Sequence, residues 1–300
     1  MSSEGVKIIF TGLDAAGKTS IILSLMREIS KIAIVKPTKS AARRTYDFLG
    51  TTISEWDLGG QQRYREDYQK NPKFFDLTDI AIFVIDIQNR VRVDEALNYL
   101  KDIIGIFKKL KIEPPIYIFI HKYDPVYASK AYKETNAFIQ NLELQIRSIS
   151  DNKFVFYKTS IYNIPTIVSA MSTVLLNRYP KKHLLDNAIR EFAPKFKAEG
   201  IELIDNNSLI IASHYKNDEV KEILNSSTHY FLSLNDVLIK PKSSQDSNLM
   251  QIERSGYYFL FKQFSLKYDA PPYHLLLLKN DQHFSLEQFN ALVKILVTLL

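Results

Sequence analysis

The chain has 300 residues, of which 46% are hydrophobic and 24% are charged, and it contains no cysteine. This composition is typical of a globular protein with enough chain for two domains. The lack of cysteine excludes disulfides, thiolate metal sites, thiol nucleophiles, prenylation and palmitoylation. No apolar run in the sequence is long enough to form a membrane-spanning helix.

The net charge of +6 comes from the first part of the chain. Residues 1–181 carry 26 Lys and Arg against 19 Asp and Glu, whereas residues 182–300 carry 13 against 14. A nucleic-acid surface would show longer basic runs or basic and aromatic residues interleaved, so no nucleic-acid partner is expected. The excess charge is expected either to steer phosphate groups or to be solvated.

The first residues, Met-Ser-Ser-Glu, lack the basic and apolar regions of a signal peptide. Ser2 also stands where myristoylation requires glycine. The sequence therefore predicts a cytoplasmic protein without a lipid anchor of its own, for which recruitment to a membrane would depend on partners.

A phosphate-binding loop is predicted at residues 12–19, Gly-Leu-Asp-Ala-Ala-Gly-Lys-Thr. Its glycines allow successive N–H groups to turn toward a polyphosphate. Lys18 can reach the β- and γ-phosphates, and the Thr19 hydroxyl can bind Mg²⁺. The apolar run Val6–Phe10 before the loop and the helical spacing of apolar residues after it favour this interpretation over a chance match.

Strands and helices alternate through the first half. A helix is expected over about residues 18–30, an irregular stretch over 31–42, and a hairpin from strands 44–49 and 51–57. Buried strands are expected at 80–86, 116–120 and 154–157, and helices at 91–110, 129–148 and 163–179. This order predicts an α/β fold with a mostly parallel six-stranded sheet, helices on both faces, and a ligand at the carboxyl ends of the strands.

Residues suited to the γ-phosphate follow the predicted hairpin. Asp57 can hold Mg²⁺, usually through water, and Gly60 can offer its N–H to a γ-phosphate. Gln61 can orient a water molecule for attack. Considered alone, an aspartate such as Asp57 would more often be a cap at the end of a strand, and its place in the chain after the phosphate loop is what favours a role in binding Mg²⁺.

Residues suited to a guanine follow the next two strands. In the sequence His-Lys-Tyr-Asp at 121–124, Asp124 can accept two hydrogen bonds from guanine. The backbone N–H groups of Thr159-Ser160-Ile161 can meet the guanine O6. His121 alone would be an ordinary buried or surface histidine, and only the order of these motifs along the chain favours a nucleotide site.

These motifs resemble those of the Ras-like small GTPases. Residues 12–19 and the sequence Trp-Asp-Leu-Gly-Gly-Gln at 56–61 are similar to the Arf family. Residues 121–124 and 159–161 are similar to the Rag/Gtr family, as are Phe-Leu-Gly at 48–50 and the apolar sequence at 209–215. The chain therefore resembles a Rag/Gtr-like GTPase with an Arf-like phosphate loop, and the resemblance covers both halves.

The resemblance implies a switch that binds GTP or GDP with Mg²⁺, hydrolyses GTP slowly without an activating partner, and changes its protein partners with the nucleotide. Gln61 would be the catalytic residue, and Mg²⁺ would be held by Thr19, Thr38 and, through water, Asp57. The nucleotide would contact Asp14, Ala15, Ala16, Gly17, Lys18, Thr19, Ser20, Thr38, Gly60, His121, Lys122, Asp124, Ser160 and Ile161.

For some of these roles the sequence offers alternative residues. Thr38 is preferred because it lies 19 residues before Asp57, the Arf-like spacing, but three other threonines are alternatives: Thr45, Thr51 and Thr52. His121 replaces the usual asparagine, which leaves guanine preference mainly to Asp124, with Lys122 along the base plane. Four arginines are candidates for an arginine finger, and spacing selects none of them: Arg43, Arg44, Arg63 and Arg65.

The second half is expected to form an α+β domain. It begins with a helix to about residue 193, followed by strands 200–205 and 208–213, a helix at 217–234, strands 257–264 and 273–279, and a helix at 285–300. A loop is expected over 241–248. The apolar stripe of the last helix would pack on its own sheet or form a dimer face. Four histidines lack metal-ligand spacing and are expected to be structural: His214, His229, His274 and His283.

This order of elements resembles the roadblock/longin-type domain of Rag proteins. The resemblance implies a GTPase domain over 1–181 and a dimerisation domain over 182–300, which would pair with a second copy, a Rag-like chain or another roadblock/longin protein. An exchange factor, an activating protein and effectors would be further partners. A scaffold that only uses nucleotide for stability and an Arf-like trafficking GTPase remain alternatives, whereas Asp124 after Lys122 disfavours an ATPase.

Overall fold

The computed structural model describes residues 5–126, 132–151, 153–238, 249–266 and 271–300. The expected loop at 241–248 and the N-terminal residues 1–4 lie outside this part of the chain. Contacts divide the chain into two compact units, Met1–Ile167 and Val168–Leu300, and each unit is described by itself. The division falls within helix α7 (Ile164–Leu176), earlier than the domain boundary expected after residue 181.

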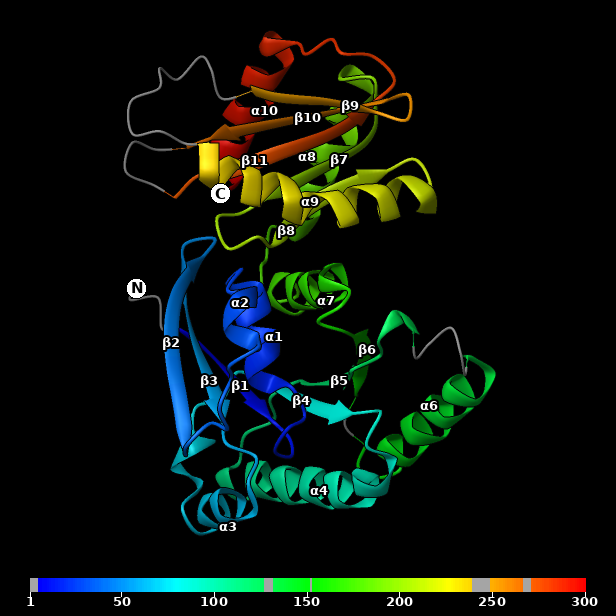
Figure 1. Cartoon of the computed structure of the whole chain (residues 1–300). Coiled ribbons are helices and arrows are strands. Elements are labelled where there is room, and N and C mark those ends of the chain that lie inside the picture. The colour runs from blue at the N-terminus through cyan, green and yellow to red at the C-terminus, as the bar shows by residue number, and fades with distance from the viewer. Residues whose placement is uncertain (1–4, 127–131, 152, 239–248, 267–270) are drawn as a thin grey trace. The chain divides into compact units, whose positions relative to one another are not determined.

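The first unit is built on a six-stranded sheet with the order β2-β3-β1-β4-β5-β6 (Figure 1). All neighbouring strands are parallel except β2 and β3, which form an antiparallel hairpin. This confirms the expected mostly parallel sheet. The strands are β1 Val6–Thr11, β2 Ala41–Phe48, β3 Thr51–Leu58, β4 Ile80–Asp86, β5 Ile116–His121 and β6 Val155–Thr159.

The register aligns the carboxyl ends of the central strands. Phe10 at the end of β1 pairs with Asp57, and Asp86 at the end of β4 pairs with His121. Loops that follow these strands therefore leave the sheet at one edge, where ligands of open parallel sheets bind.

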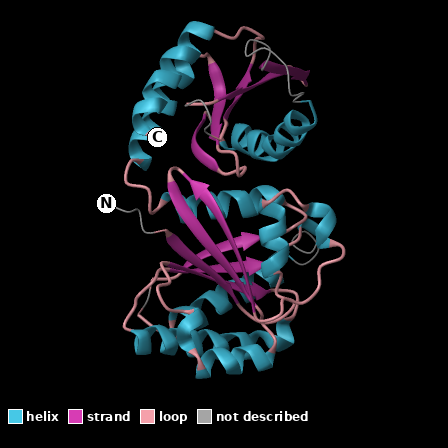
Figure 2. Cartoon of the chain, turned by 90° about the vertical axis from the view of Figure 1, so that its left-hand side faces the viewer, coloured by secondary structure: helices cyan, strands magenta, loops and turns pink. Residues whose placement is uncertain are grey.

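Helices cover both faces of this sheet because its central strands are apolar on both sides. One face packs against three helices through a single apolar cluster: α3 (Gln62–Lys70), α4 (Val93–Leu110) and α6 (Tyr132–Arg147). Helix α1 (Lys18–Leu25) lies on the opposite face (Figures 1 and 2). Short 3₁₀ turns at Pro72–Phe74 and Arg90–Arg92 precede β4 and α4.

Two local features differ from the sequence prediction. The helix expected over about residues 18–30 is interrupted after Leu25, because Arg27 adopts the left-handed conformation, with φ of 58°, and the Glu28 N–H turns back to the Leu23 carbonyl. A separate short helix, α2 (Ile29–Ile32), follows. Helix α3 was not expected, since Tyr68 is its single buried residue and the sequence has no apolar periodicity there.

The second unit is built on a five-stranded antiparallel sheet with the order β8-β7-β11-β10-β9. Helices α8 and α10 lie on one face and α9 lies on the other (Figures 1 and 2). This arrangement is compatible with a longin-like domain. Its elements are α8 Lys182–Lys195, β7 Ala198–Ile204, β8 Ile210–Tyr215, α9 Asp218–Leu238, β9 Leu249–Arg254, β10 Tyr257–Phe264, β11 Tyr273–Lys279 and α10 Leu286–Leu299.

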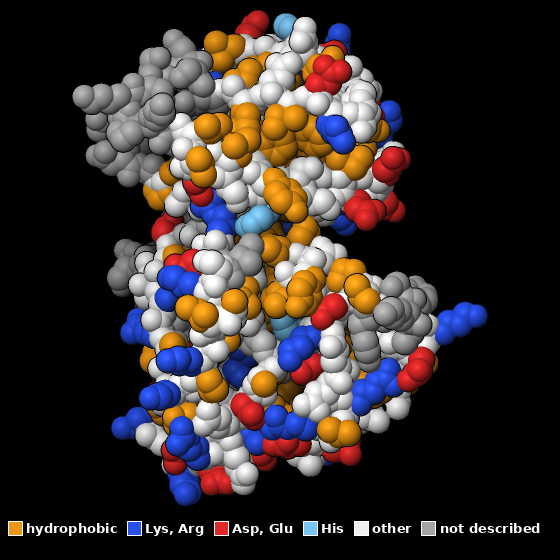
Figure 3. Space-filling view, in the orientation of Figure 1, with side chains coloured by type: hydrophobic (Ala, Val, Ile, Leu, Met, Phe, Trp, Pro, Cys, Tyr) orange, Lys and Arg blue, Asp and Glu red, His pale blue; other side chains and the backbone are white. Residues whose placement is uncertain are grey.

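Strand β9 was not expected from the sequence. It lies at the edge of the sheet, and most of its side chains are exposed, so the alternation that marks a half-buried strand is absent. In the space-filling view, hydrophobic side chains gather over β9–β11, whereas charges of both signs are interspersed over the first unit (Figure 3). No helix in the described ranges is both long and apolar enough to cross a lipid bilayer.

Candidate functional site

The loop between β1 and α1 has the backbone of a phosphate cradle. Gly12 and Gly17 have φ of 134° and 99°, values that residues with a side chain rarely adopt. A Cβ on Gly17 would lie 2.4 Å from His121 Cδ2, and one on Gly12 would lie 2.3 Å from the Val84 carbonyl oxygen. Within the described residues no side chain caps α1, so its first N–H groups are left for an anion.

Lys18 is buried beneath this loop, with 5% of its surface exposed. Its ammonium donates to the carbonyl oxygens of Gly12 and Leu13 at 3.0 and 2.8 Å. Burial lowers the pKa of Lys18 to about 8, against the opposing influence of Asp57 and Asp14. An anionic ligand in the loop would supply the charge that this ammonium lacks.

Three side-chain oxygens from three separate segments converge beside Lys18. The hydroxyls of Thr19 and Thr38 donate to Asp57 Oδ2 at 2.5 and 3.0 Å, and the two hydroxyl oxygens are 2.9 Å apart. Asp57 Oδ1 is buried and has no hydrogen-bond partner among the described residues. A carboxylate and two hydroxyls, with one oxygen unpaired, fit Mg²⁺, which uses few protein ligands when substrate phosphates complete its shell.

Of the four threonines considered, the structure places Thr38 at this cluster. Thr45 lies within β2 opposite Ser54, and Thr51 and Thr52 lie at the start of β3, away from Asp57 at its end. No group of three or more His, Asp or Glu side chains in the described part of the chain could form an alternative metal site.

The residues after β3 contact both the phosphate loop and the segment that carries Thr38. The Gly59 N–H donates to the Ser40 carbonyl at 2.6 Å. A Cβ on Gly60 would lie 2.3 Å from the Asp14 nitrogen, so glycine is needed for this close approach. Gln61 follows in an extended conformation and precedes the first residue of α3. The two loops and the phosphate loop therefore meet where a terminal phosphate would lie.

The residues expected to contact guanine also lie together. The Asp124 carboxylate accepts from the Ser160 hydroxyl at 2.5 Å through Oδ1 and from Gln88 Nε2 at 2.7 Å through Oδ2. Gln88 also donates to the Lys122 carbonyl at 2.8 Å, and the Lys122 ammonium pairs with Asp86 at 2.6 Å. Sequence reasoning missed Asp86, the last residue of β4, and Gln88, because neither belongs to a recognisable motif.

Ser160 and Ile161 differ in whether their backbone N–H groups can bind the guanine O6. The Ser160 N–H donates to the Thr166 hydroxyl at 3.1 Å, so it is not available for guanine O6 as expected. The Ser160 hydroxyl instead binds Asp124. The expected backbone contact to O6 therefore falls to Ile161.

His121 lies between the two halves of the site and is almost fully buried. Its Nδ1 is 2.9 Å from the Thr159 hydroxyl, and its ring lies against Gly17. Burial lowers the pKa of His121 to about 4, and the neighbouring Lys122 charge acts in the same direction. The imidazole is therefore neutral at neutral pH and supports the phosphate loop by packing.

The comparison with known families identifies the family to which the chain belongs. Residues 7–234 match the family model of the Gtr1/RagA G protein conserved region. The chain belongs to the Gtr1/RagA family of G proteins. It is therefore a small GTPase of the Ras superfamily, and the expected Rag/Gtr resemblance is confirmed. The match covers the first unit and continues into α9 of the second.

The chain is also similar to a solved structure of the Arl6 BBS3 small GTPase from Trypanosoma brucei with the bound nucleotide analogue GppNp. The two are 18% identical, the TM-score is 0.45, and the similarity covers 58% of this chain and 97% of that one. The family assignment rests on the match over residues 7–234.

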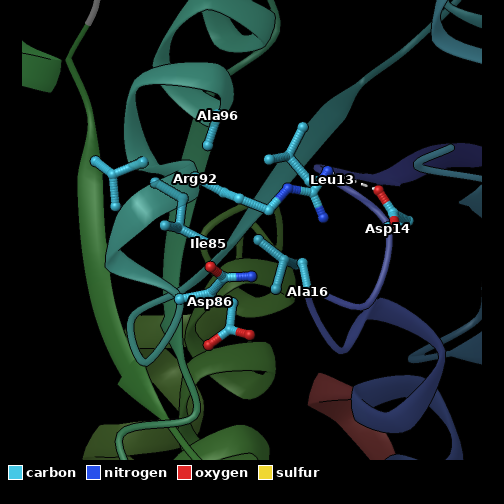
Figure 4. A pocket seen from close by; sticks show the side chains of 10 residues that line it. Leu13, Asp14, Ala16, Ile85, Asp86, Arg92 and Ala96 are labelled. Carbon is cyan, nitrogen blue, oxygen red and sulfur yellow. Dashed lines mark hydrogen bonds and ion pairs between the residues drawn. The ribbon is translucent and has the colours of Figure 1, made fainter. Parts of the chain in front are cut away.

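The structure shows the partners of the four arginines of this Rag/Gtr-family chain among which spacing could not choose. Each of the four candidate arginines is bound to another residue: Arg43 to Ser54, Arg44 to Glu55, Arg63 to Tyr64 and Arg65 to Glu95. Arg65 lies near enough to Lys18 of the phosphate loop for its charge to help lower the pKa of that ammonium. Arg92, which sequence reasoning missed, forms an ion pair with Asp14 of the phosphate loop at 2.8 Å (Figure 4). The two residues lie far apart in the sequence, so no local pattern marks this pair.

Proposed function

We propose that this Rag/Gtr-family protein is a GTP-hydrolysing switch whose nucleotide lies at the carboxyl edge of the six-stranded sheet. The observation that carries the proposal is the convergence of Thr19, Thr38 and Asp57 beside the buried Lys18. The phosphates would lie along residues 14–20, with Ala15, Ala16 and Ser20 contributing backbone contacts at the start of α1.

Thr19, Thr38 and, through water, Asp57 would hold Mg²⁺ with the nucleotide. When bound, the ion compensates the negative charge of the phosphates. The two threonine hydroxyls would supply oxygen ligands to such an ion, and the unpaired Asp57 Oδ1 would accept a hydrogen bond from a water molecule bound to it.

Guanine would be bound at the other end of the site. Asp124 would accept from the base, the Ile161 N–H would donate to O6, and the stem of Lys122 would lie along the base plane. Because a carboxylate has about four lone-pair sites, Asp124 retains acceptor capacity beside its bonds from Ser160 and Gln88.

Hydrolysis would start with a water molecule oriented by Gln61. Its oxygen attacks the γ-phosphorus, the bond to the β-phosphate oxygen breaks, and GDP and phosphate leave, with the water protons passing to phosphate and solvent. Thr38 and Gly60 would then lose their γ-phosphate contacts, which releases their segments and changes partner binding. Hydrolysis is expected to be slow without an activating protein, because the side chain of each of the four candidate arginines is bound to another residue of the chain.

Single-turnover GTP hydrolysis tests this proposal. Gln61→Leu should slow hydrolysis by at least about tenfold while leaving GTP affinity unchanged, since the substitution removes the group that orients water and no phosphate contact. Gln62→Leu is the matched control, because the Gln62 amide donates to Glu66 on the surface of α3. Equal rates for wild type and Gln61→Leu would favour a scaffold that uses nucleotide for stability alone.

The proposal extends to partners. Residues 1–181 would act as the GTPase domain and residues 182–300 as the dimerisation domain, with a second copy or another Rag-like or roadblock/longin chain as the partner. Support comes from α9, whose outward side includes the exposed apolar side chains Tyr230 and Val237, and from β9, which lies at the edge of the sheet. Exchange factors, activating proteins and effectors would act on the cytoplasmic protein, and any membrane recruitment would occur through them.

A further inference from the structure

A crevice separates the phosphate loop from the start of α4. Its lining includes Leu13, Asp14 and Ala16 from the loop and Asp86, Arg92 and Ala96 from the facing segments (Figure 4). Arg92 reaches across this crevice, and its Nη2 lies 2.8 Å from Asp14 Oδ1. This ion pair joins the phosphate loop to α4.

We propose that Arg92 is a positioning residue of the nucleotide site, which pairs with the Asp14 carboxylate and prevents it from repelling the γ-phosphate of GTP. The inference rests on the proposed function, because it requires the phosphates to lie in the loop that contains Asp14. It assigns a role in GTP binding to an arginine outside the expected motifs.

The position of Asp14 makes its charge important. The Gly60 backbone approaches the Asp14 nitrogen so closely that a Cβ on Gly60 would lie 2.3 Å from it. Gly60 is the residue proposed to offer its N–H to the γ-phosphate, so Asp14 lies at that end of the loop. An uncompensated carboxylate there would weaken binding of a nucleotide with a γ-phosphate more than binding of one without it.

The carboxylate keeps its charge in this setting. The hydrogen bond from Arg92 holds the pKa of Asp14 below its usual range, with a smaller opposing effect of burial. Asp14 is therefore ionised at neutral pH, and its compensation depends on the arginine rather than on protonation.

A second acidic residue fixes Arg92 in place. Arg92 Nε donates to Glu95 Oε2 at 2.8 Å, and Glu95 also pairs with Arg65 of α3. The Arg65 guanidinium in turn lies over the Tyr99 ring, 5.2 Å from its centroid. The four charges alternate in sign from Asp14 to Arg65, so the guanidinium of Arg92 is held between two carboxylates instead of moving freely in solvent.

Nucleotide affinities of charge variants test the inference. Fluorescent GDP and fluorescent GppNHp, a non-hydrolysable GTP analogue, are titrated with Mg²⁺ into wild type and Arg92→Ala. The variant should lose about tenfold more affinity for GppNHp than for GDP, and the difference should shrink at high salt because the repulsion is screened. If the preference between the two nucleotides does not change, the inference is wrong.

Charge rescue separates this role from a purely structural one. Adding Asp14→Asn to Arg92→Ala removes the unpaired carboxylate and should restore the wild-type preference, whereas a packing defect would persist. Arg90→Ala is the matched control, because Arg90 lies in the same 3₁₀ turn, loses the same charge and pairs with Glu134 at 2.5 Å. Failure of the double variant to restore the preference would also overturn the inference.

A folding defect of the variant and a failure of the proposed function can each be distinguished from a failure of the inference. If Arg92→Ala does not fold, Arg92→Gln keeps most of the side chain and should show the same loss of preference. If wild type binds neither nucleotide, the proposed function itself fails and the inference fails with it. If wild type binds both nucleotides and Lys18→Ala binds them more weakly, the proposed function stands. If Arg92→Ala then leaves the preference between them unchanged, only the inference fails.

Discussion

At the scale of single residues, Lys18 shows most directly what the site must bind. Its ammonium is buried with two carbonyl oxygens as its hydrogen-bond partners, and this environment lowers its pKa to about 8. Burying an ammonium whose hydrogen-bond partners are neutral carbonyl oxygens is costly, and a polyphosphate in the loop would offset that cost. Ligand binding should therefore raise the pKa of Lys18 again.

This coupling predicts that GDP binding takes up protons near pH 8. In the free protein about half of the Lys18 side chains are neutral at a pH equal to the pKa, and the bound state requires the charged form, so roughly half a proton should be taken up per nucleotide. Calorimetric titration in two buffers of different ionisation enthalpy measures this number. Lys18→Arg should abolish the uptake, because arginine stays protonated. Equal uptake in that variant would assign the proton to another group.

Several site residues could be predicted from the sequence because their signals are local or follow from topology. The phosphate loop has a recognisable sequence motif, Asp57 lies at the end of a recognisable strand, and Asp124 and Ser160 each follow one. Arg92 and Gln88 could not be predicted in the same way, since each acts through a contact with a distant part of the chain. Such pairs are created by folding and leave no local pattern.

At the scale of secondary-structure elements, the second unit contains a buried carboxyl between β7 and α9. Glu202 is fully buried, and the hydroxyls of Thr228 and Tyr215 are its hydrogen-bond partners. The Tyr215 hydroxyl also lies 3.2 Å from Asn225 Oδ1. Because this hydroxyl has one proton, a neutral Glu202 that donates to Tyr215 allows Tyr215 to donate to Asn225, and every group is satisfied.

Burial raises the pKa of Glu202 to about 7, which predicts a pH-dependent stability. Its folded pKa lies above the unfolded value, so its contribution to stability is complete below about pH 4.5 and is lost as pH rises through 7. By pH 8 this shift lowers the free energy of unfolding by about 3 kcal/mol.

The variant Glu202→Gln keeps the shape of the side chain without its ionisation. Thermal unfolding followed from pH 5 to 8 should show a smaller decline in stability for Glu202→Gln than for wild type. Glu222→Gln, on the exposed side of α9, is the control and should follow wild type. Parallel pH profiles for wild type and Glu202→Gln would show that Glu202 does not titrate in this range.

Helices and strands could be predicted from the sequence where their buried faces make apolar residues continuous or regularly spaced. Strands β4 and β5 and helix α4 have continuous or periodic apolar residues and were found at nearly the observed positions. Helix α3 and strand β9 were missed, because their exposed faces leave few buried residues to form a pattern. The break after α1 could not be predicted, because it depends on the left-handed conformation of Arg27 and the presence of an arginine does not indicate that conformation.

At the scale of the whole molecule, the proposed dimer concerns the exposed side of α9. The side chains of Tyr230 and Val237 are 74% and 79% exposed there, and Leu238 is 58% exposed. Large apolar side chains grouped on one helix face favour association with another chain.

Light scattering coupled to size exclusion tests this association. The nucleotide-loaded protein should elute at about twice the monomer mass, and the double variant Tyr230→Asp/Val237→Glu should elute as a monomer, because burying these charges opposes the interface. GDP affinity should stay unchanged in the variant and serves as the control for folding. A wild-type monomer at all concentrations tested would contradict self-association.

The central claim, that the first unit binds a guanine nucleotide through its phosphate loop, is tested most directly by calorimetric titration of GDP and ADP in the presence of Mg²⁺. Wild type should bind GDP and discriminate against ADP, because Asp124 accepts hydrogen bonds that adenine does not donate in the same place. Lys18→Ala should lose at least about tenfold in GDP affinity. Equal affinity for GDP and ADP, or unchanged GDP binding by Lys18→Ala, would contradict the assignment of the site.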